Sequence, residues 1–582
     1  MTRWRCRFLL VALGAVGMLA MGCDDADPSE RGSDAFVRTD MAGGAGGEGG
    51  IGGEGGIGGE GGIGGEGGEG GVGGEGGEGG VGGIGGEGGV GGVGGEGGFG
   101  GEGGAGGEIP CGPEPEIESC EGVAFRPCEP VVGQNGAALI RGTIVTDSRL
   151  ICDGEVLVDR DSRRIICVGE DCSGEALAAR ASVVCADIVM PGIIDPHNHM
   201  SYNTLPRWQH DRLFDNRDAW RSPLGGEMYD ALPEPTDPVA ARYNEIRLLL
   251  AGTTSVHKAQ DTPSSHDFAR NLDRADDAHG LGYDDFAFYE CVFPLADSCP
   301  TPPDYRTGQR IPERIYAAHL AEGIDPGTRA EFGEFADDGQ LGPRTTLIHC
   351  TACEGPEFTR MRAVGAKLVW SPQSNLELYG QTTDVATALN MGLTVALGTD
   401  WTPSGAMNQL GEMKCAQHVS QTWLGGRVDD RRIVRMVTDQ AARAMGVGDL
   451  IGRLRPGMFA DVLALGDGDP ATPDVDRARP YAAIVAAEAP DVRAVFIGGV
   501  AYYGDADALD PMVRWNDLCD TIDICGVEKQ VCIRTQAGAG NPNNAGDWPR
   551  FGLGEMVAYL ERVIRGLAPA NLDPDLAYIY EL

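Results

Sequence analysis

The sequence predicts an α/β fold, namely a (β/α)8 TIM barrel with a small β-sandwich domain built from the segments that flank the barrel. In residues 191–450, apolar strand-like runs alternate with helical segments, which is the pattern of βα units in a parallel sheet. Residues 137–190 and 451–505 are instead rich in short strands. A β-layer to which both ends of a barrel domain contribute is the simplest architecture for these three regions.

Five short segments supply the strands expected in this β-layer. Each one runs apolar or alternates between turn signals, as buried and half-buried strands do. They are residues 138–145, 154–158 and 164–169 before the barrel, and 460–465 and 492–499 after it.

The charge balance limits the range of partners. Of the 582 residues, 42% are hydrophobic, so the chain can bury a sizeable core. The 87 acidic and 46 basic residues give a formal net charge of −41. Such a surface repels nucleic acid, and no cluster of Lys and Arg offers a local footprint, so no nucleic-acid partner is expected. A solvated acidic surface does not identify a substrate.

The first 23 residues have the features of a bacterial lipoprotein signal peptide. Arg3, Arg5 and Arg7 form a basic start, and residues 8–21 are an apolar run too short for a membrane span. The run ends in LAMGC, which resembles a lipobox with Ala where Leu is usual. We therefore expect export and lipid attachment at Cys23, giving a membrane-anchored lipoprotein that faces the periplasm or the cell surface. Ordinary secretion and an uncleaved anchor are the alternatives.

A glycine-rich segment follows the signal. Residues 24–110 are dominated by GGEGG, GGIGG and GGVGG units. Glycine loses more entropy on ordering than other residues, and these units offer little apolar area to offset that loss. We expect a disordered acidic tether, with a glycine-rich structural helix as the alternative. Residues 111–136 would form a Cys-rich, disulfide-pinned lead-in. Residues 506–582 are a C-terminal extension, in which 556–564 have the spacing of a docked amphipathic helix.

The cysteines agree with an oxidising compartment. Of 17 cysteines, Cys6 leaves with the signal and Cys23 is lipidated, so 15 remain and at least one thiol stays free. Pairs that are close in sequence suit disulfides, and they are Cys167/Cys172, Cys291/Cys299 and Cys519/Cys525. The CxxC motif from Cys350 to Cys353 lies at an expected strand–loop junction and is a weak signal for a zinc ribbon.

An HxH motif is the strongest chemical signal. His197 and His199 follow the apolar run 190–194, and on a strand residues i and i+2 face the same side. Both imidazoles would then project from one strand end into one site, which suits a metal ion. Two surface histidines are the alternative interpretation of this motif alone.

Two further strands end in residues of the same kind. His319 ends one strand, with Glu322 three residues later, and Asp400 ends the apolar run 393–399. Barrel enzymes carry their reactive groups at the C-terminal ends of strands. Three imidazoles and one carboxylate suit zinc or ferrous iron better than magnesium or calcium. The sequence therefore predicts a divalent metal site, with zinc as the first candidate and iron as the second.

At this point the chain resembles the amidohydrolase superfamily, in particular the branch that includes imidazolonepropionase, guanine deaminase and triazine hydrolase. Four more segments match that branch in order, and they are AGTTSV at 251–256, TTLIHC at 345–350, SPQSN at 371–375 and GRLRPGMFAD at 452–461. The resemblance covers about residues 138 to 503. Together the motifs are specific for the superfamily and unspecific for the substrate.

The resemblance implies that His197, His199, His319 and Asp400 are the metal ligands. A bound divalent metal lowers the pKa of its water to roughly 7, which makes hydroxide accessible at neutral pH. Asp400 would also act as a catalytic residue, because it can take the proton of this water while an sp² carbon is attacked.

The resemblance also implies catalytic roles for Glu322 and His349. Glu322 matches the acid/base of an HxxE element and would protonate a ring nitrogen or leaving group. His349 would contact the metal-bound water or the substrate and stabilise the oxygen of a tetrahedral intermediate. Many relatives hold a second metal, bridged by a carboxylated Lys of the fourth strand. Residues 286–293, where that strand is expected, contain no Lys, so we predict one metal ion.

Four residues are candidate substrate contacts. Arg217 and Trp220 lie in the long first loop over the barrel mouth, where specificity is usually set. Arg217 would grip a substrate carboxylate, with a structural salt bridge as the alternative. Lys258 follows the second strand, where a solvated loop is the alternative, and Trp401 follows Asp400. Asn375 is expected to shape a loop. The histidines that match no ligand position are His210, His266, His279 and His418.

The expected activity is hydrolysis of a non-peptide C–N bond in a small cyclic amide, cyclic amidine or aminated heterocycle. The HxxE element favours ring or imine-like nitrogen chemistry. A dipeptidase or lactonase-like amidohydrolase is a second hypothesis. A non-catalytic, surface-tethered binding lipoprotein on a decayed barrel is a third, but it predicts missing ligands, whereas all four are present. A homo-oligomer is compatible with the sequence.

Overall fold

A computed structural model describes residues 119–205, 207–208, 210–224, 238–257, 268–272, 280–281, 289–292, 315–469, 475–509, 518–534, 550 and 552–567. The expected signal, tether and start of the lead-in lie outside these residues, as do Lys258, His266, His279 and Cys299. Among the described helices, none has the length and apolar character needed to cross a membrane.

The flanking segments meet in one continuous nine-stranded sheet, in the order β16-β17-β15-β14-β13-β4-β1-β2-β3. The strands before the barrel are β1 (Ala137–Val145), β2 (Leu150–Asp159), β3 (Arg164–Gly169) and β4 (Ser182–Pro191). Those after it are β13 (Val462–Leu465), β14 (Val492–Ile497), β15 (Val500–Gly504), β16 (Leu518–Ile524) and β17 (Val527–Arg534). The join is antiparallel, with Met190 of β4 opposite Leu463 of β13. The expected shared β-layer is therefore confirmed.

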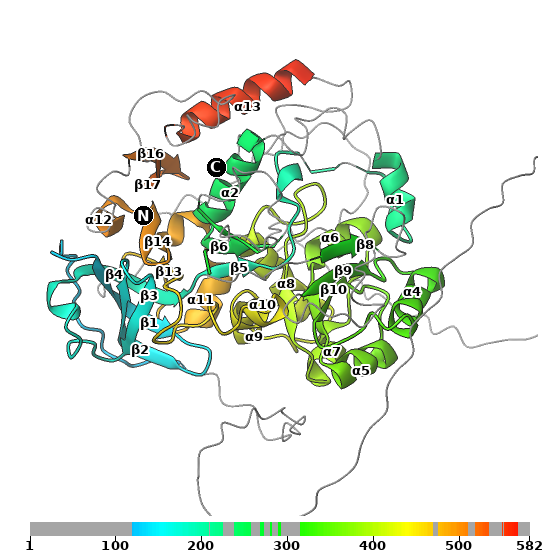
Figure 1. Cartoon of the computed structure of the whole chain (residues 1–582), viewed down its shortest axis with the longest axis horizontal. Helices are drawn as coiled ribbons and strands as arrows, with labels where there is room; N and C mark the ends of the chain where they lie inside the picture. The colour runs from blue at the N-terminus through cyan, green and yellow to red at the C-terminus, as the bar shows by residue number, and fades with distance from the viewer. Residues whose placement is uncertain are drawn as a thin grey trace, which may run out of the picture. The chain divides into compact units, whose positions relative to one another are not determined.

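Eight parallel strands form the other half of the fold, in two sheets with the orders β5-β6-β7 and β12-β11-β10-β9-β8. The first sheet contains β5 (Ile193–Asp195), β6 (Thr253–Val256) and β7 (Arg270–Asn271). The second contains β8 (Tyr289–Val292), β9 (Tyr316–Leu320), β10 (Thr345–His349), β11 (Lys367–Trp370) and β12 (Val395–Leu397). From β9 to β12 the described strands and helices alternate along the chain, which is a TIM-barrel-like α/β arrangement (Figure 1).

The helices of this half lie between and after the strands. They are α4 (Pro326–Asp337), α5 (Gly355–Val364), α6 (Pro372–Tyr379), α7 (Val385–Asn390), α8 (Gln409–Thr422), α9 (Asp430–Met436) and α10 (Asp439–Ala444). Several starts are set by local chemistry, because the side chains of Asp325, Asp384 and Asn408 accept hydrogen bonds from the first turns of α4, α7 and α8. Helix α6 starts with Pro372 and ends at Gly380, whose φ of 63° suits a residue without Cβ.

Five further helices complete the described structure. They are α1 (Arg217–Leu224), α2 (Pro238–Leu250), α11 (Pro480–Ala486), α12 (Ala506–Leu509) and α13 (Leu553–Leu567). Helix α13 packs against α2 and buries Leu553, Met556 and Leu560, so the docked helix expected near 556–564 is confirmed. The extension also contributes β16 and β17 to the sheet, which the sequence did not reveal.

The first and last parallel strands are joined just beyond their ends. Asn198 and Asp400 form an isolated parallel β-bridge. In it, the His199 N–H donates to the Asp400 carbonyl at 2.7 Å, and the Asp400 N–H donates to the His197 carbonyl at 2.9 Å. Main-chain hydrogen bonds therefore fix the HxH motif against Asp400, which lies two hundred positions away in the sequence.

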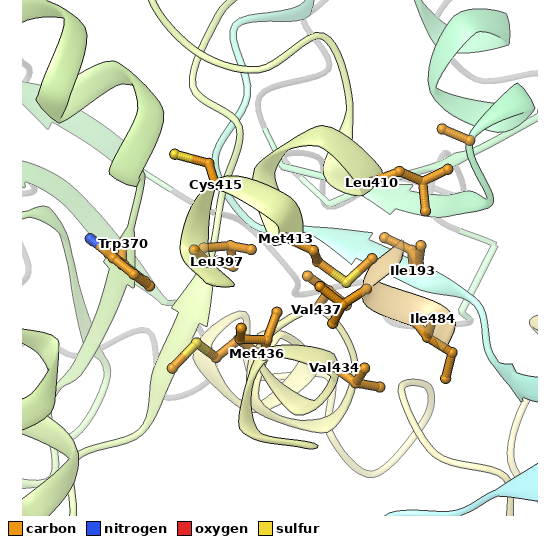
Figure 2. Close-up of a cluster of buried hydrophobic side chains, with 14 of the residues drawn as sticks. Ile193, Trp370, Leu397, Leu410, Met413, Cys415, Val434, Met436, Val437 and Ile484 are labelled. Atoms are coloured by element: carbon orange, nitrogen blue, oxygen red, sulfur yellow. The ribbon is translucent and has the colours of Figure 1, made fainter. Parts of the chain in front are cut away.

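A buried apolar cluster supports β5 and β12 from behind. Figure 2 shows Met413 of α8, Ile484 of α11 and Val437, which directly follows α9, gathered around Ile193 of β5 and Leu397 of β12. Each of these five side chains has no exposed surface. Burial of one such side chain contributes roughly 1.5–3 kcal/mol, so the cluster holds both strands firmly in place.

Disulfides pin the lead-in to the sheet. Cys120 is bonded to Cys152 of β2, and Cys128 to Cys185 of β4. The expected pair Cys167–Cys172 is confirmed, and the CxxC cysteines Cys350 and Cys353 are bonded to each other at the end of β10.

The expected pair Cys519–Cys525 is wrong, because Cys519 is bonded to Cys532. Strands β16 and β17 are antiparallel, with Asp520 opposite Val531, so Cys532 lies across the ladder from Cys519. Cys525 lies instead at the hairpin tip, with a φ of 51°. Cross-strand register therefore outweighs closeness in sequence.

A disulfide that spans a longer segment of chain should stabilise the protein more. In the loop-entropy view, Cys128–Cys185, with a separation of 57 residues, contributes about 4 kcal/mol, and Cys167–Cys172, with a separation of 5, about 2 kcal/mol. We expect the double variant Cys128→Ala/Cys185→Ala to lower the apparent Tm more than Cys167→Ala/Cys172→Ala, as measured by thermal denaturation without reductant. Equal or reversed shifts would contradict this expectation.

Candidate metal centre

Side chains of the four expected ligands converge at the C-terminal ends of β5, β9 and β12. The Nε2 atom of His197 lies 3.3 Å from Nε2 of His199 and 3.0 Å from Nε2 of His319. The Nε2 atoms of His199 and His319 are 3.3 Å apart. The Oδ1 atom of Asp400 lies 3.5 Å from Nε2 of His197 and 3.4 Å from that of His199.

This geometry fits a single cation of the zinc type. Ligand atoms at roughly 2.1 Å around a tetrahedral cation lie roughly 3.4 Å apart, close to the five separations given above. Three imidazole nitrogens that all point at one place cannot satisfy one another by hydrogen bonding, because a neutral ring offers only one N–H. A cation between them removes the conflict, and the donor set of three nitrogens and one carboxylate oxygen suits zinc or iron.

The backbone at the strand ends is shaped for this purpose. Asp400 and His349 have φ values of 64° and 66°, which L side chains adopt at a cost of the order of 1–3 kcal/mol and which cluster at functional sites. Gly398 makes close packing possible behind the site, since a Cβ there would lie 2.6 Å from Cβ of His197.

The expected catalytic residues flank the ligands. The Nε2 atom of His349 lies 3.8 Å from Oε1 of Glu322 and 4.0 Å from Oδ2 of Asp400. Burial alone would raise the pKa of the Glu322 carboxyl, but its surroundings, including the charge of Arg217 and the hydrogen bond from Tyr379, outweigh burial and lower it. Glu322, His349 and Asp400 are all nearly inaccessible to solvent.

Helix α6 and the residue before it bond to four of these groups. The contacts are Ser371 Oγ to His197 Nδ1 at 3.0 Å, Ser374 Oγ to Asp400 Oδ2 at 2.6 Å, Asn375 Nδ2 to His349 Nδ1 at 3.1 Å and Tyr379 OH to Glu322 Oε1 at 2.7 Å. One short helix and the serine before it therefore orient two of the candidate ligands and both flanking catalytic candidates.

The contact to Asn375 fixes the tautomer of His349. An amide nitrogen can only donate, so Nδ1 of His349 accepts, and its proton resides on Nε2. His349 thus presents a hydrogen-bond donor to the reaction space, as required for a group that stabilises a developing oxyanion. Asn375, expected to shape a loop, instead lies in α6.

The oxygen atoms of Asp400 are held by a one-way chain of donors. Trp401 Nε1 donates to Ser404 Oγ at 2.6 Å, Ser404 Oγ lies 2.8 Å from Ser374 Oγ, and Ser374 Oγ donates to Asp400. An indole N–H only donates and a carboxylate only accepts, so each hydroxyl must pass its hydrogen toward Asp400.

Of the four candidate substrate contacts, three lie within the described residues, and their surroundings differ. Arg217 binds Glu331 through Nη1 and Nη2, at 3.1 and 2.8 Å, and is buried, so it occupies the structural salt bridge that was its alternative. Trp220 and Trp401 pack with ring centroids 5.7 Å apart, and the Trp401 ring lies 6.4 Å from that of His199. Lys258 lies outside the described residues.

Some polar residues near the site were missed. Asp195 is fully buried in β5 and accepts hydrogen bonds from Thr399 and Asn198, and burial raises its pKa. Glu412 of α8 accepts from the N–H of Gln373, and burial raises its pKa well above the usual value. A carboxylate inside the apolar run before the HxH motif was a usable signal for Asp195. No comparable signal marked Glu412.

Two histidines set aside earlier are described and lie away from the ligands. His210 pairs with Glu377 at 3.3 Å and packs on Trp208 and Phe214. His418 is exposed on α8. Their structural interpretation agrees with these positions.

Comparisons with known proteins point in one direction. A sequence-family model described as "Amidohydrolase family" matches residues 315–503. The chain is 27% identical over 414 residues to a 5-methylthioadenosine/S-adenosylhomocysteine deaminase of Halobacterium salinarum, which covers 63% of this chain and 92% of the relative. It is 26% identical over 370 residues to the protein of the same name from Teredinibacter turnerae, covering 56% and 82%.

A solved structure supports the fold. The zinc-bound adenosine deaminase of Xanthomonas campestris aligns with a TM-score of 0.51 and 16% identity, covering 74% of this chain and 98% of that protein. At this identity the likeness bears on the fold alone.

The hydroxyl of Ser374 should strengthen metal binding through Asp400. Loss of an outer hydrogen-bond partner typically lowers metal affinity by about 10- to 100-fold. We expect Ser374→Ala to show such a loss in zinc competition titrations with a chromogenic chelator. Ser420→Ala serves as the control, because Ser420 is also buried but bonds the carbonyl of Val428. An unchanged affinity in Ser374→Ala would contradict the assigned role.

Proposed function

Because this chain belongs to the amidohydrolase superfamily, we propose that it is a metal-dependent hydrolase that acts on a non-peptide C–N bond of a small cyclic amide, cyclic amidine or aminated heterocycle. The observation that carries the proposal is the convergence of three imidazole nitrogens and the Asp400 carboxylate, with Glu322 and His349 beside them. The names of the relatives, which are deaminases of adenine compounds, favour an aminated heterocycle within this range.

The metal would be one divalent ion, zinc in preference to iron, held by His197, His199, His319 and Asp400. When bound, it lowers the pKa of water to roughly 7 and so supplies a nucleophile at neutral pH. Strand β8, at the position of the fourth barrel strand, contains no Lys that could bridge a second ion.

The protein groups then divide the proton transfers between them. Asp400, oriented by Ser374, accepts the proton of the attacking water. His349 donates from Nε2 to the oxygen that becomes negative as the trigonal carbon turns tetrahedral. Glu322, once protonated, delivers its proton to the ring nitrogen or the departing amine, which prevents expulsion of a strongly basic anion. The attacking water releases two protons in total, so one replaces the proton that Glu322 gives up and the other, taken by Asp400, leaves with the amine.

A second part of the proposal concerns the fold around the site. We infer that the two parallel sheets close into a (β/α)8 barrel over residues 191–450. We also infer that seven strands of the nine-stranded sheet, β1–β4 and β13–β15, belong to a small β-sandwich domain formed by 137–190 and 451–505, to which the extension adds β16 and β17. The Asn198–Asp400 bridge supports closure, because it links the ends of β5 and β12. The likeness to the Xanthomonas deaminase is consistent with the barrel.

Metal content and turnover test the proposed function together. We expect about one zinc per chain by elemental analysis, and loss of turnover by at least about 10³-fold in His197→Ala, since the metal-derived nucleophile disappears. His418→Ala, which changes an exposed histidine of α8, should keep both properties. The assay panel contains aminopurines, cyclic ureides and N-acyl amino acids or dipeptides.

The panel also separates the competing functions. Release of ammonia from aminopurines or opening of cyclic ureides supports the proposal. Turnover confined to dipeptides, N-acyl amino acids or lactones would establish the dipeptidase or lactonase-like alternative. Metal binding without turnover of any compound would favour a binding protein.

We further propose that the chain is exported and held at a membrane by lipid on Cys23. The disulfides of the described residues support export, because such bonds persist mainly in oxidising compartments. We expect Cys23→Ala to move the protein from the membrane to the soluble fraction and to abolish incorporation of labelled fatty acid. Cys6→Ala, within the signal, should leave both unchanged. Retention of lipid label by Cys23→Ala would overturn the proposal.

A further inference from the structure

A second donor chain ends on Glu322. Trp220 Nε1 donates to the hydroxyl of Tyr379 at 2.8 Å, and this hydroxyl donates to Oε1 of Glu322 at 2.7 Å. Trp220 comes from α1, Tyr379 from the last position of α6, and Glu322 from the segment after β9. Three segments distant in sequence thus meet in one line of hydrogen bonds.

The chemistry of the three groups fixes the direction of this chain. An indole N–H is a donor only, so the Tyr379 oxygen must accept from Trp220. The single hydroxyl hydrogen of Tyr379 is then directed to Glu322. Because Oε1 already accepts this hydrogen, a proton carried by Glu322 resides on Oε2. The chain therefore selects which oxygen of Glu322 exchanges a proton.

Contacts of the main chain hold the Trp220 end of this line of hydrogen bonds close to its Glu322 end. The N–H of Arg217 donates to the carbonyl of Glu322 at 3.2 Å, and Asn216 forms a β-bridge with Gly323. Arg217 also binds Glu331, whose carboxylate accepts from the N–H of Ala321. The start of α1 is thus tied to the main chain on both sides of Glu322, which gives Trp220 a fixed place relative to that carboxylate.

The surroundings of Tyr379 keep its hydroxyl protonated, so that it remains a hydrogen-bond donor. Tyr379 and Glu322 are almost completely buried, and Trp220 packs on Trp401. Burial and the neighbouring Glu322 charge raise the pKa of Tyr379 well above its ordinary value, so the hydroxyl stays protonated. A hydrogen bond from a neutral donor to a buried carboxylate is stronger than the same bond in water.

From this geometry we propose that Tyr379 and Trp220 are positioning residues for the acid/base step: they hold Oε1 of Glu322 as a fixed acceptor, so that Oε2 delivers the proton to the substrate nitrogen. The proposal rests on the proposed function, because it assigns Glu322 the role of proton donor in C–N bond hydrolysis. The chain that runs from Trp401 to Asp400 is built in the same way, so each of the two site carboxylates receives a hydroxyl hydrogen backed by an indole.

Turnover by Tyr379→Phe tests the positioning role. The variant keeps the ring and removes the donor, so we expect kcat to fall by about 10- to 100-fold, with KM, metal content and Tm close to those of the wild type. Trp220→Phe, which leaves the Tyr379 bond to Glu322 in place, should lower kcat less. Tyr503→Phe is the matched control, since Tyr503 is a buried tyrosine of β15 in the flanking sheet, and it should keep full activity. A Tyr379→Phe enzyme with unchanged kcat would overturn the proposal.

A spectroscopic measurement tests the chain without turnover. In an NMR spectrum of ¹⁵N-indole-labelled protein, each of the 8 tryptophans gives one indole N–H peak. The peak that is lost in Trp220→Phe belongs to Trp220. Glu322→Gln makes the terminal acceptor neutral while keeping its shape. If the three groups are coupled, this peak moves upfield in Glu322→Gln and further in Tyr379→Phe. A peak that stays in place in Glu322→Gln shows that the residues merely pack together, and the proposal fails.

The two measurements separate the two hypotheses. An inactive wild type with a coupled Trp220 peak rejects the proposed function while the positioning chain stands. An active wild type with an uncoupled peak, or with a fully active Tyr379→Phe variant, rejects the positioning chain while the proposed function stands.

Discussion

Three imidazole nitrogens lie within 3.3 Å of one another beside a buried carboxylate, and the rest of the structure is organised around this crowding. Nitrogen lone pairs directed at a common point repel one another unless a cation lies between them. The protein maintains that arrangement with main-chain hydrogen bonds between the ends of β5 and β12, positive φ angles at Asp400 and His349, and an apolar cluster behind both strands. These supports hold the four side chains together at one place.

Helix α6 orients the side chains of this crowded site. With the serine that precedes it, the helix supplies one outer partner each to His197, Asp400, His349 and Glu322. Its own position is fixed by Glu412 of α8, which accepts from the N–H of Gln373. Since these contacts share one rigid element, a displacement of α6 would disturb ligand orientation, tautomer and proton delivery together. A binding protein would have no need for such coordinated control of protonation.

Sequence patterns were sufficient to predict which four side chains converge, and insufficient to predict the residues that support them. His197, His199, His319 and Asp400 each follow an apolar strand, and strand periodicity with the polarity of parallel sheets brings such residues to one edge. Ser374 and Tyr379 face the site because of the way α6 is rotated about its axis. That rotation depends on packing, which short motifs do not encode. Arg217 shows the same limit, because a loop arginine can face a substrate or a carboxylate such as Glu331, and only the fold decides. In the extension, the hairpin register that pairs Cys519 with Cys532 was equally invisible.

The pairing of β4 with β13 has a consequence for biogenesis. Met190 lies opposite Leu463, so the strand that leads into the HxH motif, already paired with β1, acquires its second neighbour only after most of the chain has left the ribosome. Topologies with such high contact order fold slowly, because a long loop must close before the contact forms. A nascent polypeptide of this kind stays unfolded for longer than one built from local contacts, and this property would favour the export proposed above if the channel admits only unfolded chains.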